Sequence, residues 1–112
     1  MRTLVHKTAG YDNMMINVNG SSFRLEAVPQ HVVDAYGDCE LSDGVGPGVI
    51  RVSEDIIGEA LLDTLIHEYT HADMDFLSEP FVERHGKGLA RFLMQLGLID
   101  ISKLNARALR LK

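Results

Sequence analysis

Two histidines and a glutamate in the middle of the chain have the types and spacing of a metal-binding motif. The run His67-Glu68-Tyr69-Thr70-His71 places two of the five histidines of the chain four residues apart. On a helix, residues four apart lie on one face, so both imidazoles can bind one ion. Glu68 is adjacent and does not compete for that ion, so its carboxylate can take a proton from a water molecule there. The motif predicts a zinc (Zn2+) site on His67 and His71, with Glu68 as general base.

The alternative is that these residues meet by chance on a helix surface. The spacing arises by chance in roughly one chain in a hundred of this length and composition. Helix signals in residues 54–75 favour the metal site, and so does the helical wheel at about 100° per residue. On that wheel His67 and His71 share a face with Ala60 and Thr64, opposite an apolar stripe. The stripe consists of Leu61, Leu62, Leu65, Ile66, Tyr69 and Ala72.

A catalytic zinc site also needs a third protein ligand and an open fourth position. The segment after the motif offers Glu79, Glu83 and His85. On a regular wheel His85 falls within the apolar stripe of a second helix, whereas both glutamates point toward solvent. That stripe consists of Phe81, Val82, Leu89, Phe92, Leu93 and Leu96. Antiparallel packing of the two helices would bring His85 level with the histidine pair. We therefore expect His85 to be the third ligand, with Glu83 and Glu79 as open alternatives.

The first half of the chain predicts the β-structure that would support these helices. Residues 14–18 and 21–28 flank Asn19-Gly20, a strong short hairpin signal. Residues 36–48 are rich in glycine and acidic residues and predict a loop. This loop leads into a short strand at residues 49–53, which is rich in β-branched residues.

The second half predicts two helices. Ser53 is a suitable N-cap for a helix over residues 54–75, which carries the motif. Ser78 predicts the start of a second helix that runs to about Leu96, where Gly97 ends it. Residues 100–112 could form a last short helix. The strands followed by helices indicate an α+β class.

Length and composition indicate one domain over residues 1–112. The hydrophobic fraction of 46% and the charged fraction of 24% are typical of a globular protein with a modest core. A formal net charge of −5 argues against nucleic acid as a direct partner. The single cysteine, Cys39, excludes an internal disulfide. Neither a signal peptide nor a membrane-spanning run is evident, so we expect a cytoplasmic protein without a membrane partner.

Other candidate side chains have less support. Asp75 lies one helical turn after His71 and could accept a hydrogen bond from its ring, although an exposed acidic residue is the more ordinary interpretation. Tyr11 and Tyr36 could each stabilise an oxyanion, and the sequence does not choose between them. Tyr69 falls on the apolar stripe of its helix, which argues against such a role.

The motif and the run that follows it resemble the catalytic core of the SprT-like metallopeptidases, the group that includes Spartan. The resemblance covers roughly residues 45–97 and depends on the HExxH motif, on His85-Gly86-Lys87 and on the letters GLARFL. In that family the histidine of the His-Gly pair completes the zinc site. The resemblance implies a small zincin-like α+β fold, with zinc on His67, His71 and His85.

The resemblance also implies roles for other parts of the chain. Glu68 would be the general base, and the strand at 49–53 would run beside the motif helix and hold an extended substrate. Family members often carry a cysteine-based zinc ribbon or a DNA-binding tail, and this sequence contains neither. The chain is similar to the minimal single-domain versions that are common in phage genomes.

Two functions from different classes follow from these observations. The first is a zinc-dependent peptide hydrolase that acts on a peptide or an unfolded protein. The second is a zinc-stabilised binding module without turnover. A structural zinc site has no use for a carboxylate that activates water, so Glu68 favours the hydrolase. The sequence leaves the oligomeric state open.

Overall fold

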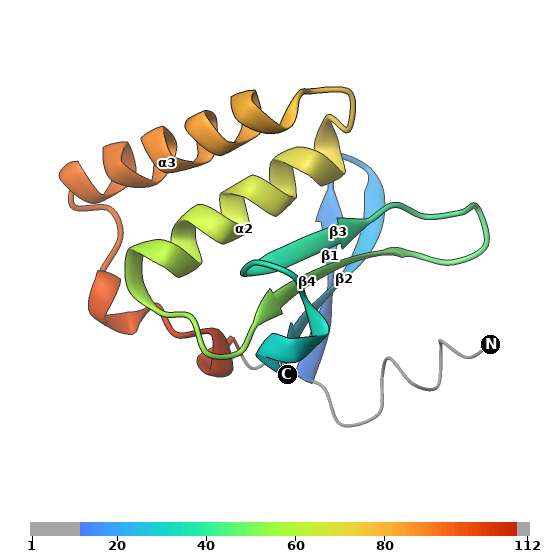
Figure 1. Ribbon diagram of the computed structural model, residues 1–112, viewed down its shortest axis with the longest axis horizontal. Coiled ribbons are helices and arrows are strands. Elements are labelled where there is room, and N and C mark those ends of the chain that lie inside the picture. Colours follow the sequence, from blue (N-terminus) through green and yellow to red (C-terminus); the bar gives the residue numbers. More distant parts are fainter. Residues whose placement is uncertain (1–11, 110–112) are drawn as a thin grey trace.

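The computed structural model describes residues 12–109 and shows a four-stranded sheet with two helices on one side of it (Figure 1). The strands are β1 (Asp12–Val18), β2 (Ser21–Val28), β3 (Gly37–Glu40) and β4 (Gly48–Ser53), in the spatial order β1-β2-β4-β3. β1 and β3 each pair antiparallel with their neighbours, whereas β2 and β4 are parallel. A mixed sheet with two helices confirms the α+β class.

The hairpin between β1 and β2 turns at the expected residues. Asn19 and Gly20 have φ values of 47° and 98°, a left-handed conformation that these two residue types adopt at low cost. The side-chain oxygen of Asn17 accepts a hydrogen bond from the Gly20 N–H at 2.8 Å, which closes the turn.

β3 lies in a segment that was expected to be only loop, and this part of the prediction was wrong. Its residues have low strand propensity, so the strand depends on pairing with β4 rather than on local preference. Asp38 lies opposite Arg51 in the ladder and accepts a hydrogen bond from its Nε at 2.8 Å. β4 is consequently an interior strand, and the sheet edge on this side belongs to β3.

The motif helix α2 (Gly58–Asp73) begins four residues later than expected. Ser53 does not cap it but ends β4, fully buried, and its hydroxyl accepts a hydrogen bond from the Asp55 N–H at 3.2 Å. The second helix, α3 (Glu79–Gln95), has the predicted N-cap, since the Ser78 hydroxyl accepts a hydrogen bond from the Phe81 N–H at 3.4 Å. It is followed by Gly97 in a left-handed conformation with φ of 74°.

Two short 3₁₀ turns, Ile101–Lys103 and Ala106–Ala108, replace the expected last helix. The fully buried Ala106 joins Val52, Ile56 and Leu61 in a cluster beneath the start of α2. Leu65 packs against both this cluster and the one between the sheet and the rest of α2. The core therefore fixes α2 along its length against the sheet.

The helix α3 packs on α2 and lies beyond it as seen from the sheet (Figure 1). Its buried residues are Val82, Gly86 and Ala90, which are spaced four apart. Of the residues expected to face inward, Val82 is buried, whereas Phe81, Phe92 and Leu96 are more than half exposed, at 51%, 54% and 55%. The face that packs on α2 thus shares Val82 with the predicted stripe but is turned toward Gly86 and Ala90, because small residues let two helices approach more closely than bulky ones. No helix within residues 12–109 is long and apolar enough to cross a membrane.

Candidate metal centre and its cleft

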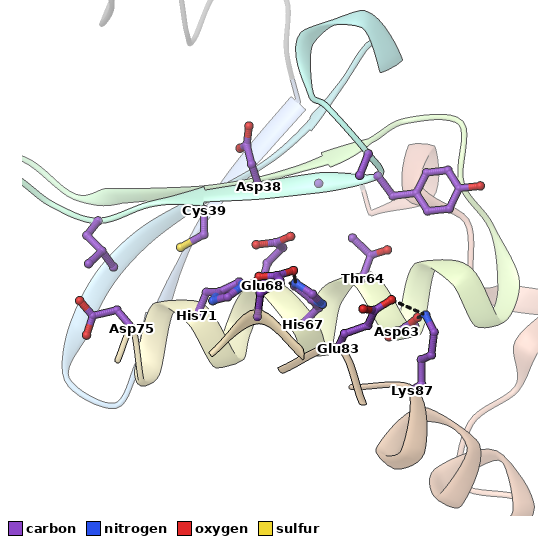
Figure 2. Close-up of a pocket in the computed structure, with 15 residues that line it drawn as sticks. Asp38, Cys39, Asp63, Thr64, His67, Glu68, His71, Asp75, Glu83 and Lys87 are labelled. Atoms are coloured by element: carbon purple, nitrogen blue, oxygen red, sulfur yellow. Dashed lines mark hydrogen bonds and ion pairs between the residues drawn. The ribbon is translucent and has the colours of Figure 1, made fainter. Parts of the chain in front are cut away.

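A cleft of about 600 Å³ runs between β3, α2 and the start of α3. Figure 2 shows His67, Glu68 and His71 in the middle of this cleft, with β3 above them. Asp75 lies at one end of it, and Asp63 lies with Lys87 at the other. The motif residues thus share one cavity, as their spacing on a helix predicts.

Three side chains meet at one point in the cleft. The Nε2 atoms of His67 and His71 are 3.2 Å apart. The two carboxylate oxygens of Glu79 lie 2.9 Å from His67 Nε2 and 2.8 Å from His71 Nε2. Among the described residues, these three form the group of histidine, cysteine and acidic side chains whose ligand atoms lie within 4.8 Å of one another.

The connection between the helices places Glu79 there. The helix α2 ends at Asp73, and Ser78 caps α3, so Glu79 occupies the first helical position of α3. A connection this short keeps the first turn of α3 beside the last turn of α2, where His71 lies. Gly86 lets the two helices approach closely, since a Cβ atom built on it would lie 3.0 Å from Asp63 Oδ1.

His85 does not join this group, contrary to the expectation that it completes the site. Its side chain is exposed, and its ring stacks on Phe81 with centroids 5.8 Å apart. It lines a separate surface depression with Phe92. The physical reason is the packing of α3 through Val82 and Gly86, which turns residue 85 away from α2. The open alternative Glu79 takes its place, whereas Glu83 binds Lys87 at 3.7 Å.

The three side chains fit the requirements of a zinc ion. Two imidazole nitrogens and a carboxylate oxygen are common zinc donors. Tetrahedral geometry with bonds of about 2.0–2.1 Å requires donor atoms to be about 3.3 Å apart. The Nε2 atoms of His67 and His71, 3.2 Å apart, are close to this value. The contacts of 2.9 and 2.8 Å join them to different oxygens of Glu79, so the carboxylate has to turn for one oxygen to face both nitrogens. The Glu79 side chain is 64% exposed, so the protein leaves room for this turn.

Glu68 lies beside this group, buried beneath β3. It is 6% exposed and makes no hydrogen bond or ion pair with any described residue. Burial, together with the negative charges of Asp38 and Glu79, raises the pKa of Glu68 from 4.5 to about 7. Neither oxygen of Glu68 is fully enclosed by protein, so the carboxylate reaches the cleft, where water or a ligand can contact it.

β3 approaches α2 closely because residue 37 is a glycine. A Cβ atom on Gly37 would lie 2.7 Å from the Arg51 carbonyl oxygen and 2.9 Å from Thr64 Cγ2. Cys39, two residues on, points from β3 toward α2 (Figure 2). Burial, followed by the charges of Glu68 and nearby acids, raises the pKa of the Cys39 thiol to about 12.

The remaining candidates divide between the cleft and the outside. Tyr36 and Asp75 line the cleft, and Asp75 makes no hydrogen bond with His71 or any other described residue. Tyr69 is 42% exposed, so it belongs neither to the cleft nor to the core where it was expected. Tyr11 lies outside the described residues.

The sequence contains a signal that could have identified Glu79. Ser78 is a recognisable N-cap, and the connection after the motif helix is short, so the first turn of α3 had to lie near His71. Comparisons of the chain with protein-family models, with curated proteins and with solved structures found no match. The functional conclusion therefore depends on the cleft and on the residues that line it.

Proposed function

We propose that this protein is a zinc-dependent peptide hydrolase. His67, His71 and Glu79 would hold the ion, and Glu68 would act as general base. The observation that carries the proposal is Glu68, which is 6% exposed, makes no hydrogen bond or ion pair with the described residues and lines the cleft beside three potential zinc ligands. A site that used zinc only for stability would have no need of this carboxylate.

The chemistry divides between the ion and the residues of the chain. A zinc ion in such a site supplies Lewis-acid activation of a carbonyl group and of water. Glu68 accepts the proton of the attacking water and returns it to the leaving amine. A carboxylate can make both transfers, because it can take up a proton and release it again.

The edge of β3 supplies a binding surface for an extended peptide. Five consecutive residues, 35–39, line the cleft. Successive side chains of a strand point to opposite faces, so side chains alone would bring only every second residue to the cleft. It is therefore the backbone edge of this segment that borders the cleft. β3 pairs with β4 on its other side, so a substrate can add as a further strand through main-chain hydrogen bonds. This role moves from β4, where the sequence suggested it, to β3.

The proposal agrees with the resemblance to SprT-like metallopeptidases in the HExxH residues and differs from it in the third ligand. A sheet edge beside an HExxH helix supports a zincin-like architecture with Glu68 as base. The third ligand differs, since Glu79 takes the position that the resemblance implied for His85. A metal-stabilised binding module is the competing function, and it predicts no dependence on Glu68.

Hydrolysis of an unstructured protein tests the proposal. Zinc-loaded protein is expected to cleave carboxymethylated casein, to lose this activity with a chelator, and to regain it with added zinc. The variant Glu68→Gln is expected to bind zinc as the unchanged protein does but to be slower by roughly 100-fold or more, the size of a general-base contribution.

The control for this assay is Glu83→Gln, an exposed carboxylate near the rim that lies outside the ligand group. It is expected to retain activity. Cleavage that persists in the presence of chelator, or in Glu68→Gln at an unchanged rate, would contradict the proposal. Zinc binding without any cleavage by the unchanged protein would favour the binding module.

A further inference from the structure

We infer that the cleft selects peptides with a lysine or arginine on the N-terminal side of the scissile bond, and that Asp75 binds this cationic side chain. The inference rests on the proposed hydrolase function. It adds a substrate class and a residue that determines specificity.

The first observation is that the lining of the cleft is mainly acidic. Six of the described residues that line it are acidic, against one lysine, Lys87. That lysine is already used at one end of the cleft, where it binds Asp63 at 3.2 Å and Glu83 at 3.7 Å. Asp75, at the opposite end, is exposed and has no hydrogen bond or ion pair with any described residue (Figure 2). The carboxylates at the Lys87 end are therefore paired with a cation, whereas the Asp75 carboxylate is not, and the Asp75 end favours a cation from a ligand.

The second observation is independent of surface acidity and supports the inference that the cleft receives a ligand. Glu68 is more than nine-tenths buried, lines the same cavity and has no described hydrogen-bonding partner. The ligand group of His67, His71 and Glu79 lies beside it. An acidic end adjoining such a centre can contact the part of a substrate next to the reacting bond.

The direction of β3 indicates that Asp75 lies on the N-terminal side of the scissile bond of a bound peptide. Gly37, at the start of β3, packs over Thr64 and Glu68, and in Figure 2 the following residue pair, Asp38 and Cys39, progresses toward the Asp75 end. A peptide that adds to this edge in the more stable antiparallel sense runs the opposite way. Its N-terminal part then lies at Asp75, and its C-terminal part at Lys87.

Sequencing of cleavage sites tests this inference. The zinc-loaded protein is incubated with a synthetic mixture of unstructured peptides of varied sequence, and the cut positions are read by mass spectrometry. Lysine and arginine are expected to be enriched roughly threefold on the N-terminal side of cut bonds, the effect of one exposed ion pair. The enrichment should fall as NaCl is raised, because salt screens exposed charges.

Substitutions at Asp75 provide the sharper readout. Asp75→Asn should remove the enrichment, and Asp75→Lys should replace it with enrichment of aspartate and glutamate. The matched control is Asp73→Asn, which removes the same charge two residues away. Asp73 bonds Asn19 at 2.8 Å and lies outside the cleft, so this variant should keep the preference for basic residues.

The outcomes separate the two proposals. Cleavage without enrichment of basic residues, or an enrichment that Asp75→Lys leaves unchanged, would overturn the role of Asp75 while the hydrolase function stands. Failure of the unchanged protein to cut any peptide in the mixture would overturn both.

Discussion

Cys39 lies on β3 in a part of the cleft that disfavours an additional negative charge. Burial is the main cause of its raised pKa, and Glu68, Asp38 and Glu40 contribute in the same direction. The thiol is thus held in its protonated form, which is the unreactive form toward alkylating reagents. Its position beside the site therefore does not make it a nucleophile.

Alkylation of the metal-free protein by iodoacetamide tests this property of Cys39. A pKa of about 12 instead of 9.0 predicts a rate at pH 8 roughly 1,000-fold below that of the unfolded chain. The rate should rise about tenfold per pH unit beyond pH 9, where the rate for the urea-unfolded control levels off. If the alkylation rate of the folded protein instead levelled off near pH 9, the pKa of Cys39 would not be raised.

The residues of the motif could be predicted because their relation is local. His67, Glu68 and His71 lie on one helix, whose period fixes their directions regardless of the rest of the fold. Glu79 belongs to another helix, and its position depends on which face of α3 packs against α2. The wheel of α3 correctly included Val82 but missed Gly86 and Ala90, because the size of the side chains, rather than their apolarity, decides which residues contact α2 there.

The two glycines of α3 illustrate packing at the scale of the element. Gly86 faces α2 with Asp63 at 3.0 Å from the position of an added Cβ, whereas Gly88 has no atom within 4 Å. They lie on the same helix, two residues apart, and differ mainly in this contact. The close approach at Gly86 also sets the distance between α3 and α2 at which Glu79 lies near His71.

Substitution of these glycines should have opposite effects on stability. Gly86→Leu is expected to lower the free energy of unfolding by about 1–3 kcal/mol, because the added atoms force the helices apart. Gly88→Ala is expected to raise it by up to about 1 kcal/mol, because alanine has the higher helix propensity. Urea unfolding with an unchanged m-value provides the measurement. Equal effects of both substitutions would contradict the observed packing.

Among the strands, β3 shows the limit of sequence prediction. The β1–β2 hairpin follows from Asn19-Gly20 and the apolar runs beside it, which act locally. Gly37–Glu40 has no such local preference and becomes a strand through its ladder with β4 and the pair of Asp38 with Arg51. Because β3 forms the edge of the cleft, missing it also displaced the expected substrate strand.

At the scale of the whole molecule, the proposed ion would connect elements that are otherwise held mainly by packing. His67 and His71 lie at the end of α2, and Glu79 begins α3. An ion bound by all three would join the helices at their connected ends, opposite the C-terminal segment that packs against the start of α2. Metal binding to the folded state should therefore stabilise the entire domain.

Thermal unfolding measures this coupling. Zinc at 100 times its dissociation constant should add about 2.7 kcal/mol to the free energy of unfolding. For a domain of this size, that corresponds to a rise in Tm of roughly 10–20 °C. The variant His71→Ala, which lacks a ligand, should show little rise. An equal rise in this variant would place the ion elsewhere.

Zinc affinity of Glu79→Gln and His85→Ala tests the central claim most directly, with isothermal titration as the measurement. The geometry predicts that Glu79→Gln loses more than about 100-fold in affinity, because even residues outside the ligand shell contribute 10- to 100-fold. His85→Ala should bind zinc like the unchanged protein, since its ring stacks on Phe81 outside the ligand group. Full affinity in Glu79→Gln, together with loss in His85→Ala, would contradict the account.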